Sequence, residues 1–158
     1  MIEFKLSEDQ AFRLYHSVTD ESIKNILEQH IPILKMVPVT ERVKTFEDAC
    51  KVLGREPYDE EQLAKLGLPK NDIAYLKMVV IVEALNEGWD PDVCNSDVER
   101  WYPWFKPNGS PSSFAFHGST YVYVLALAGS GSRLALKSEQ LANYCGKQFL
   151  ELWKEILL

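Results

Sequence analysis

Apolar residues recur at intervals of three and four positions through much of the first ninety residues, the spacing of helices that bury one face. A capping box from Ser7 to Gln10 predicts a first short helix. A second helix is expected from Thr19 to Pro32, because proline cannot continue it. Residues 33–39 are predicted to be an extended connection or a short edge strand. The side chains expected to face inward from the two helices are Phe12, Leu14, Tyr15, Ile23, Ile26, Leu27 and Ile31.

Three further helices are predicted before residue 90. Thr45 begins a capping signal, and its helix should end at Gly54. A short helix around 60–66 and a longer one from the cap at 71–72 to residue 87 follow. The longer segment contains the apolar, partly β-branched run 78–82, which would also fit a strand. Its helix-forming flanks favour a central helix that is buried on all sides.

After residue 100 the pattern changes to short β-type runs that alternate with glycine turns. Residues 114–117 and 120–128 are predicted to form a hairpin whose turn is Gly118-Ser119. Residues 132–137 should form a third strand. Residues 102–106 are expected at an edge of the sheet, because prolines interrupt them.

From Ser138 onward one apolar stripe predicts a single amphipathic helix that packs on the sheet. The predicted fold class is therefore α+β, with N-terminal helices, a small antiparallel β-meander and a C-terminal amphipathic helix. A chain of 158 residues without a linker is expected to form one domain. Within it we distinguish an N-terminal helical extension (1–40), a helical part (42–100), and the meander with the last helix (101–158).

Charge singles out the segment from Trp101 to Lys137, which contains no Asp or Glu although the whole chain has 23. This acid-free segment cannot supply a carboxylate for acid–base chemistry or for a metal. It is rich in aromatic residues, and its fixed charges are Lys106, Arg133 and Lys137. The chain as a whole has a formal net charge of −6, which argues against an electrostatic binder of nucleic acids.

Cysteine usage and apolar runs indicate the compartment. Cys50, Cys94 and Cys145 form no CxxC pair, so neither a disulfide framework nor a zinc site is predicted. The N-terminus lacks the basic and apolar regions of a signal peptide, and the longest apolar run is far too short to span a bilayer. We expect a cytoplasmic protein without membrane contact.

Two loops resemble ligand-binding motifs but miss essential positions. In the loop that begins at Asp90, Asn95 stands where a calcium loop needs glycine and Trp101 where it needs glutamate. The Gly129–Gly131 loop lacks the lysine of a phosphate loop and lies between two predicted strands. We therefore predict no metal and no cofactor.

Candidate catalytic residues are few. No Gly-x-Ser-x-Gly motif is present, and His16 and His30 lie on predicted helix surfaces. His117 lies among hydroxyls and aromatic rings, where Tyr121 or Ser119 could assist it. A small enzyme with a cleft near His117 is one alternative, but no base pairs with it in the sequence, and a non-catalytic role is favoured.

The cluster Trp101-Tyr102-Pro103-Trp104-Phe105 is the strongest candidate for binding. On a strand, Trp101 and Phe105 face opposite to Tyr102 and Trp104. One set is expected in the core, and the other is expected to be available to a partner. The predicted binding residues are Trp101, Tyr102, Trp104, Phe105, His117 and Arg133.

Several stretches also occur together in a known set of proteins. They are 45–50 with Leu53-Gly54, 84–89 with Pro91-Asp92, 102–105, 131–134, and Leu141-Ala142 with Tyr144 and 146–149. Over residues 42–158 the chain thereby resembles a family of small proteins of gut bacteria and their phages that has no assigned activity. Members of that family often have an aromatic where Val93 stands, and a glycine-rich, variable middle. The resemblance implies a phage or mobile-element setting, and no catalytic residue is carried over.

These observations predict a non-catalytic binding or assembly protein, encoded by a phage or mobile element. Its aromatic β segment would contact a partner protein, a second copy of itself or a small ligand. Besides the enzyme near His117, a second alternative is a weak binder of single-stranded nucleic acid. It would use a basic surface made of Arg100, Arg133, Lys137 and Lys147.

Overall fold

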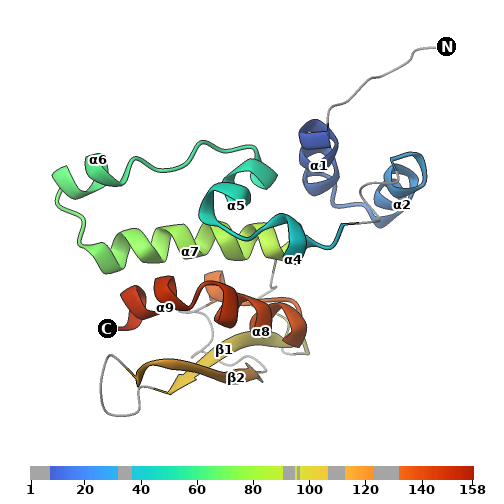
Figure 1. Ribbon diagram of the computed structural model, residues 1–158. Coiled ribbons are helices and arrows are strands. Elements are labelled where there is room, and N and C mark those ends of the chain that lie inside the picture. Colours follow the sequence, from blue (N-terminus) through green and yellow to red (C-terminus); the bar gives the residue numbers. More distant parts are fainter. Residues whose placement is uncertain (1–7, 32–36, 91–94, 96, 107–112, 123–131) are drawn as a thin grey trace.

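The computed structural model shows an α+β fold, as predicted, in which stacked helices lie over a two-stranded antiparallel sheet (Figure 1). The structure describes residues 8–31, 37–90, 95, 97–106, 113–122 and 132–158. The N-terminal and middle helices are α1 (Glu8–Ser17), α2 (Glu21–His30), α4 (Val39–Arg42), α5 (Phe46–Leu53), α6 (Glu60–Lys65) and α7 (Lys70–Asn86). The remaining elements are β1 (Arg100–Lys106), β2 (Ala115–Val122), the 3-10 helix η2 (Ser132–Leu134), α8 (Glu139–Gln148) and α9 (Leu150–Leu157).

Helix α7 is the centre of the core. It buries nine of its 17 residues, among which Met78, Ile81 and Leu85 have no measurable exposure, while Glu83 remains exposed. Helix α5 packs on one side of α7 and α9 on the other (Figure 1). The preference for a helix over a strand at 78–82 is therefore confirmed. The helix begins at Lys70, slightly before the predicted cap, and no side chain caps it.

The sheet pairs β1 with β2, and its register differs from the predicted hairpin. Trp104 lies opposite Gly118 while Phe105 lies opposite Phe116, so His117 is the extra residue of a β-bulge. The predicted turn at Gly118-Ser119 is wrong, because β2 runs straight through both residues. Residues 123–128 of the predicted strand lie outside the described residues.

The third strand predicted at 132–137 is replaced by η2 and a single bridge from Leu136 to β1. The buried amide of Asn86, near the end of α7, explains the difference. Its Nδ2 donates to the Ala135 carbonyl at 2.8 Å, and its Oδ1 accepts from the Lys137 backbone N–H at 3.0 Å. The amide thus occupies backbone groups that a longer ladder would need.

The single C-terminal helix that was predicted is broken at Phe149, whose backbone (φ −109°, ψ 31°) leaves the helical region. Ser138 caps α8 as expected by accepting from the Leu141 N–H. Helix α8 packs on the sheet, whereas α9 packs on α7, and the buried Trp153 of α9 meets Phe105 of β1. Because of this break, the apolar side of α8 covers the sheet while the apolar side of α9 covers α7.

The N-terminal helices lie at the edge of the molecule (Figure 1). Helix α1 contacts α5 and buries Ala11, but α2 buries no residue. The prediction that Ile23 and Ile26 face inward is therefore wrong, because their side chains are 46% and 54% exposed, and the same prediction for Leu14 of α1 fails at 40% exposure. At the expected extended connection, Val39 already belongs to α4, and residues 33–36 lie outside the described residues.

Gly146 sets the distance between α8 and the sheet. A Cβ at this position would overlap the ring of Phe116 and stand 2.8 Å from the Cβ of Pro103. By contrast, a Cβ at Gly118 would meet nothing within 4 Å. The two glycines therefore have opposite roles, since the first is required by packing and the second leaves open space.

We expect Gly146→Ala to lower the free energy of unfolding by about 1–3 kcal/mol, because the helix or the ring must shift. Gly118→Ala should leave stability unchanged or raise it by up to about 1 kcal/mol, because alanine suits a strand interior better than glycine. Urea unfolding followed by circular dichroism measures both variants. Equal destabilisation by the two substitutions would contradict this account.

Candidate functional site

One face of the sheet belongs to the core. Phe105 lies 5.4 Å from the ring of Trp153, and Trp101 lies 4.9 Å from the ring of Tyr121. Pro103 lies between them on β1, against Gly146 of α8. Pro103 and Phe105 hold the sheet on α8 and α9, whereas Tyr121 is 42% exposed.

The opposite face carries an exposed aromatic cluster. Trp104 is 51% exposed, although a tryptophan side chain usually buries most of its surface. The ring of His117 meets it edge-on at 4.5 Å, and the Lys106 Nζ lies 5.9 Å from its centroid. We call this surface the outer sheet face, and its exposed residues are Trp104, Lys106, Ala115, His117 and Thr120.

The outer sheet face is open next to Trp104 and carries no negative charge of its own. Gly118 lies opposite Trp104 in the register and leaves the space above it unfilled by described atoms. Tyr102, two residues before Trp104, is half-buried, and burial raises the pKa of its hydroxyl. That hydroxyl is buried without a hydrogen-bond partner among the described residues. The outer sheet face therefore offers the exposed ring of Trp104, the cation of Lys106 and open space above Gly118.

The structure divides the predicted binding residues. Trp104 and His117 come together on the outer sheet face, beside the half-buried Tyr102. Trp101 and Phe105 instead pack against the core, which confirms that the two sets face opposite ways. Arg133 is exposed in η2, outside both strands. The prediction left out Ala115, Thr120 and Lys106 of this surface, although the charge of Lys106 and its position two residues after Trp104 were available.

The outer sheet face is the candidate binding site, and comparison with known proteins gives no similar site. No protein-family model, curated protein or solved structure matches the chain. The resemblance to proteins of gut bacteria and their phages therefore stays a prediction. Within the described ranges, no three His, Cys, Asp or Glu side chains gather as metal ligands would, and no helix is long and apolar enough to span a membrane.

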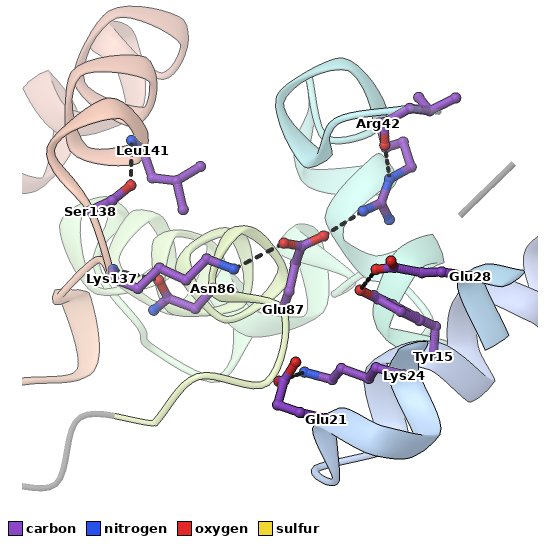
Figure 2. Close-up of polar contacts among 11 residues, drawn as sticks. Tyr15, Glu21, Lys24, Glu28, Arg42, Asn86, Glu87, Lys137, Ser138 and Leu141 are labelled. Atoms are coloured by element: carbon purple, nitrogen blue, oxygen red, sulfur yellow. Dashed lines mark hydrogen bonds and ion pairs between the residues drawn. The ribbon is translucent and has the colours of Figure 1, made fainter. Parts of the chain in front are cut away.

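A second polar cluster, which the sequence did not predict, lies at the C-terminal end of α7 (Figure 2). Glu87 accepts from Arg42 Nη2 at 2.6 Å and from Lys137 Nζ at 2.9 Å. Arg42 also donates from Nε to the Val37 carbonyl. Burial lowers the pKa of Arg42, and the adjacent Glu87 carboxylate opposes that effect. This ion cluster joins α4, α7 and the segment before α8.

Glu87 is also strained. Its backbone adopts φ 51° and ψ 47°, the left-handed region that costs a residue with a side chain roughly 1–2 kcal/mol. Its N–H donates to the Ala84 carbonyl and so closes the end of α7. A glycine at this position would be the usual choice, so the side chain is retained against a backbone cost. Nothing in the sequence marks Glu87, because the neighbouring Gly88 is the expected helix stop.

The ion cluster forms one wall of an open cleft of about 400 Å³. The opposite wall comes from the N-terminal helices, where the Tyr15 hydroxyl donates to Glu28 Oε1 at 2.6 Å (Figure 2). Burial, together with this hydrogen bond and nearby carboxylates, raises the pKa of Tyr15. The cleft is distinct from the outer sheet face, because none of the residues of that face lines it.

The two described cysteines lie in the core. Cys145 is buried and lies 3.8 Å from the Met78 sulfur, and burial raises the pKa of its thiol to about 12. Burial also raises the pKa of Cys50. Both thiols are free, as predicted, and neither has the environment of a nucleophile.

For the ion cluster we expect Glu87→Gln to lower the free energy of unfolding by about 1–3 kcal/mol, because a neutral amide no longer balances a buried guanidinium. Glu87→Gly loses the same charge but relieves the backbone strain, so it should be less destabilised than Glu87→Gln by about 1 kcal/mol. Chemical denaturation measures the difference. If Glu87→Gly were the less stable variant, the left-handed strain would be refuted.

For Cys145 we expect very slow alkylation by iodoacetamide at pH 8 in the native protein. Raising the pKa of the thiol from 9.0 to about 12 leaves about a thousandfold less thiolate at that pH, and burial blocks the reagent as well. Peptide mass spectrometry before and after addition of urea measures this protection. Equal labelling rates in the two conditions would show that Cys145 is accessible.

Proposed function

We propose that this chain is a non-catalytic binding protein and that the outer sheet face is the surface that receives a protein partner. The observation that carries the proposal is Trp104, which is half exposed although the neighbouring rings of β1 are packed into the core. An exposed tryptophan next to open space is typical of the residues that dominate binding energy at protein interfaces.

The chemistry of the outer sheet face suits a protein partner. Trp104 and His117 supply rigid apolar area with a polar edge, and Lys106 supplies one charge at the rim. A rigid ring loses little conformational entropy on binding, and so its contact area is used efficiently. The acid-free segment around it avoids repulsion of carboxylates on a partner.

The alternative of a small enzyme has less support. His117 is exposed and its described ring contact is Trp104, rather than a carboxylate or a hydroxyl that could activate it. It also does not line the described cleft. The alternative of a nucleic-acid binder is opposed by the net charge of −6.

We expect Trp104→Ala to weaken partner binding by about tenfold or more, the effect of removing a central interface aromatic. Stability should fall by about 1 kcal/mol, because half of the ring is already in solvent and the other half loses its buried contacts. The measurement is quantitative capture of proteins from the host by the immobilised full-length chain, followed by titration of the captured protein against each variant.

Two further variants complete the test, one that blocks the outer sheet face and one that serves as a control. Gly118→Gln adds a polar side chain where described atoms leave space, so it should block a partner without loss of stability. Ile26→Ala removes an apolar side chain that is 54% exposed on α2, a matched loss far from the sheet. A partner that binds Trp104→Ala and Gly118→Gln as tightly as the unaltered protein would refute the proposal.

A further inference from the structure

A second exposed surface of this chain combines apolar side chains with acidic residues, and so complements the outer sheet face with its Lys106. Helix α6 buries none of its residues, and Leu66 at its end is 71% exposed. Tyr58, just before α6, is 40% exposed. Four of the six residues from Glu56 to Glu61 are acidic and none is basic. We call this surface the α6 patch, and its residues are Glu56, Tyr58, Asp59, Glu60, Glu61 and Leu66.

The α6 patch and the outer sheet face match in apolar content and in charge. Each combines exposed apolar side chains with charge. The α6 patch has four carboxylates, of which Glu60 pairs with Lys77 and Glu61 with Lys65, and the outer sheet face has Lys106. Glu61 forms an ion pair with Lys65 at 3.7 Å, but its side chain is 87% exposed and remains accessible from solvent. Opposite charges at the rim of an apolar contact steer association and select its orientation.

The positions of the two surfaces prevent them from meeting within one molecule. Figure 1 shows α6 on one side of α7, whereas α8, α9 and the sheet lie on the other. Two copies of the chain can bring them together, with the α6 patch of one copy against the outer sheet face of the next. Such a contact uses two different surfaces, so it leaves one free surface at each end of the pair.

We propose that the partner of the outer sheet face is the α6 patch of a second copy of this chain, in a head-to-tail contact that seats Leu66 and Tyr58 on Trp104. This inference rests on the proposed function, because it names the occupant of the same surface. Repetition of the contact extends the assembly beyond a dimer. A contact made of a few side chains on each side is weak, and it depends on salt through its rim charges.

The test is analytical ultracentrifugation of the full chain from about 10 to about 500 µM, the range in which weak contacts become populated. We expect the average mass to rise with concentration past that of a dimer at low salt, and to fall when salt is raised. Lys106→Glu should weaken association by about three- to tenfold, because it faces acidic residues. Lys147→Glu is the matched control, since Lys147 lies over Phe116 on the α8 side of the sheet.

Two variants separate this contact from other modes of association. Trp104→Ala removes the sheet side and Leu66→Ser removes the α6 side, and each variant alone should stay monomeric. Their mixture should form a 1:1 dimer and nothing larger, because Leu66→Ser still offers a sheet face and Trp104→Ala still offers an α6 patch. Thermal melts of both variants, whose altered side chains are largely exposed, verify that each is folded.

The outcomes are distinguishable. A chain that stays monomeric throughout, or a mixture that stays monomeric while the unaltered chain associates, overturns the head-to-tail contact. The proposed function then still stands if a different protein binds in a manner that depends on Trp104. If Trp104→Ala associates as the unaltered chain does, the outer sheet face is not the contact, and the self-association proposal is overturned. If Trp104→Ala also leaves capture of host proteins unchanged, both proposals fall.

Discussion

The rest of the structure depends on the burial of α7. This helix buries nine of its 17 residues and leaves Glu83 in solvent, so other elements must cover most of its surface. Helix α5 covers one side and α9 the other, with Met78, Ile81 and Leu85 at the centre. The layered arrangement of Figure 1 follows from this requirement, because α9 continues into α8 through Phe149, and α8 in turn carries the sheet.

The C-terminal end of α7 fixes how those layers meet. Asn86 binds the backbone on both sides of Leu136 and so holds the chain just before α8. Glu87, one residue later, pairs with Lys137 of that same segment and with Arg42 of α4. A buried amide and a charged pair lose much of their energy when displaced, since their partners are left in a medium of low polarity. The strained backbone of Glu87 is therefore held by contacts that would be costly to break.

Local signals in the sequence were sufficient for most helices. The capping box at Thr45 and the cap at Ser138 were correct, because such motifs act within one turn of the chain. The errors arose where distant contacts override a local preference. The third strand is lost to the amide of Asn86, about fifty residues away, and the predicted turn at Gly118 is lost to pairing with β1. Likewise Glu87 carries no local signal, because its role is set by Arg42 and Lys137.

Register explains why Trp104 faces outward but not why it is tryptophan. Side chains alternate along β1, so a shift by one residue would bury Trp104 and expose the rings of Trp101 and Phe105. Close approach of α8 at Gly146 fits the present register, because it needs Pro103 beneath the helix. The fold therefore forces the side chain of residue 104 into solvent, where a polar residue would satisfy the same strand. About half of this large apolar side chain stays in solvent, and the partner contact that we propose would account for its being a tryptophan.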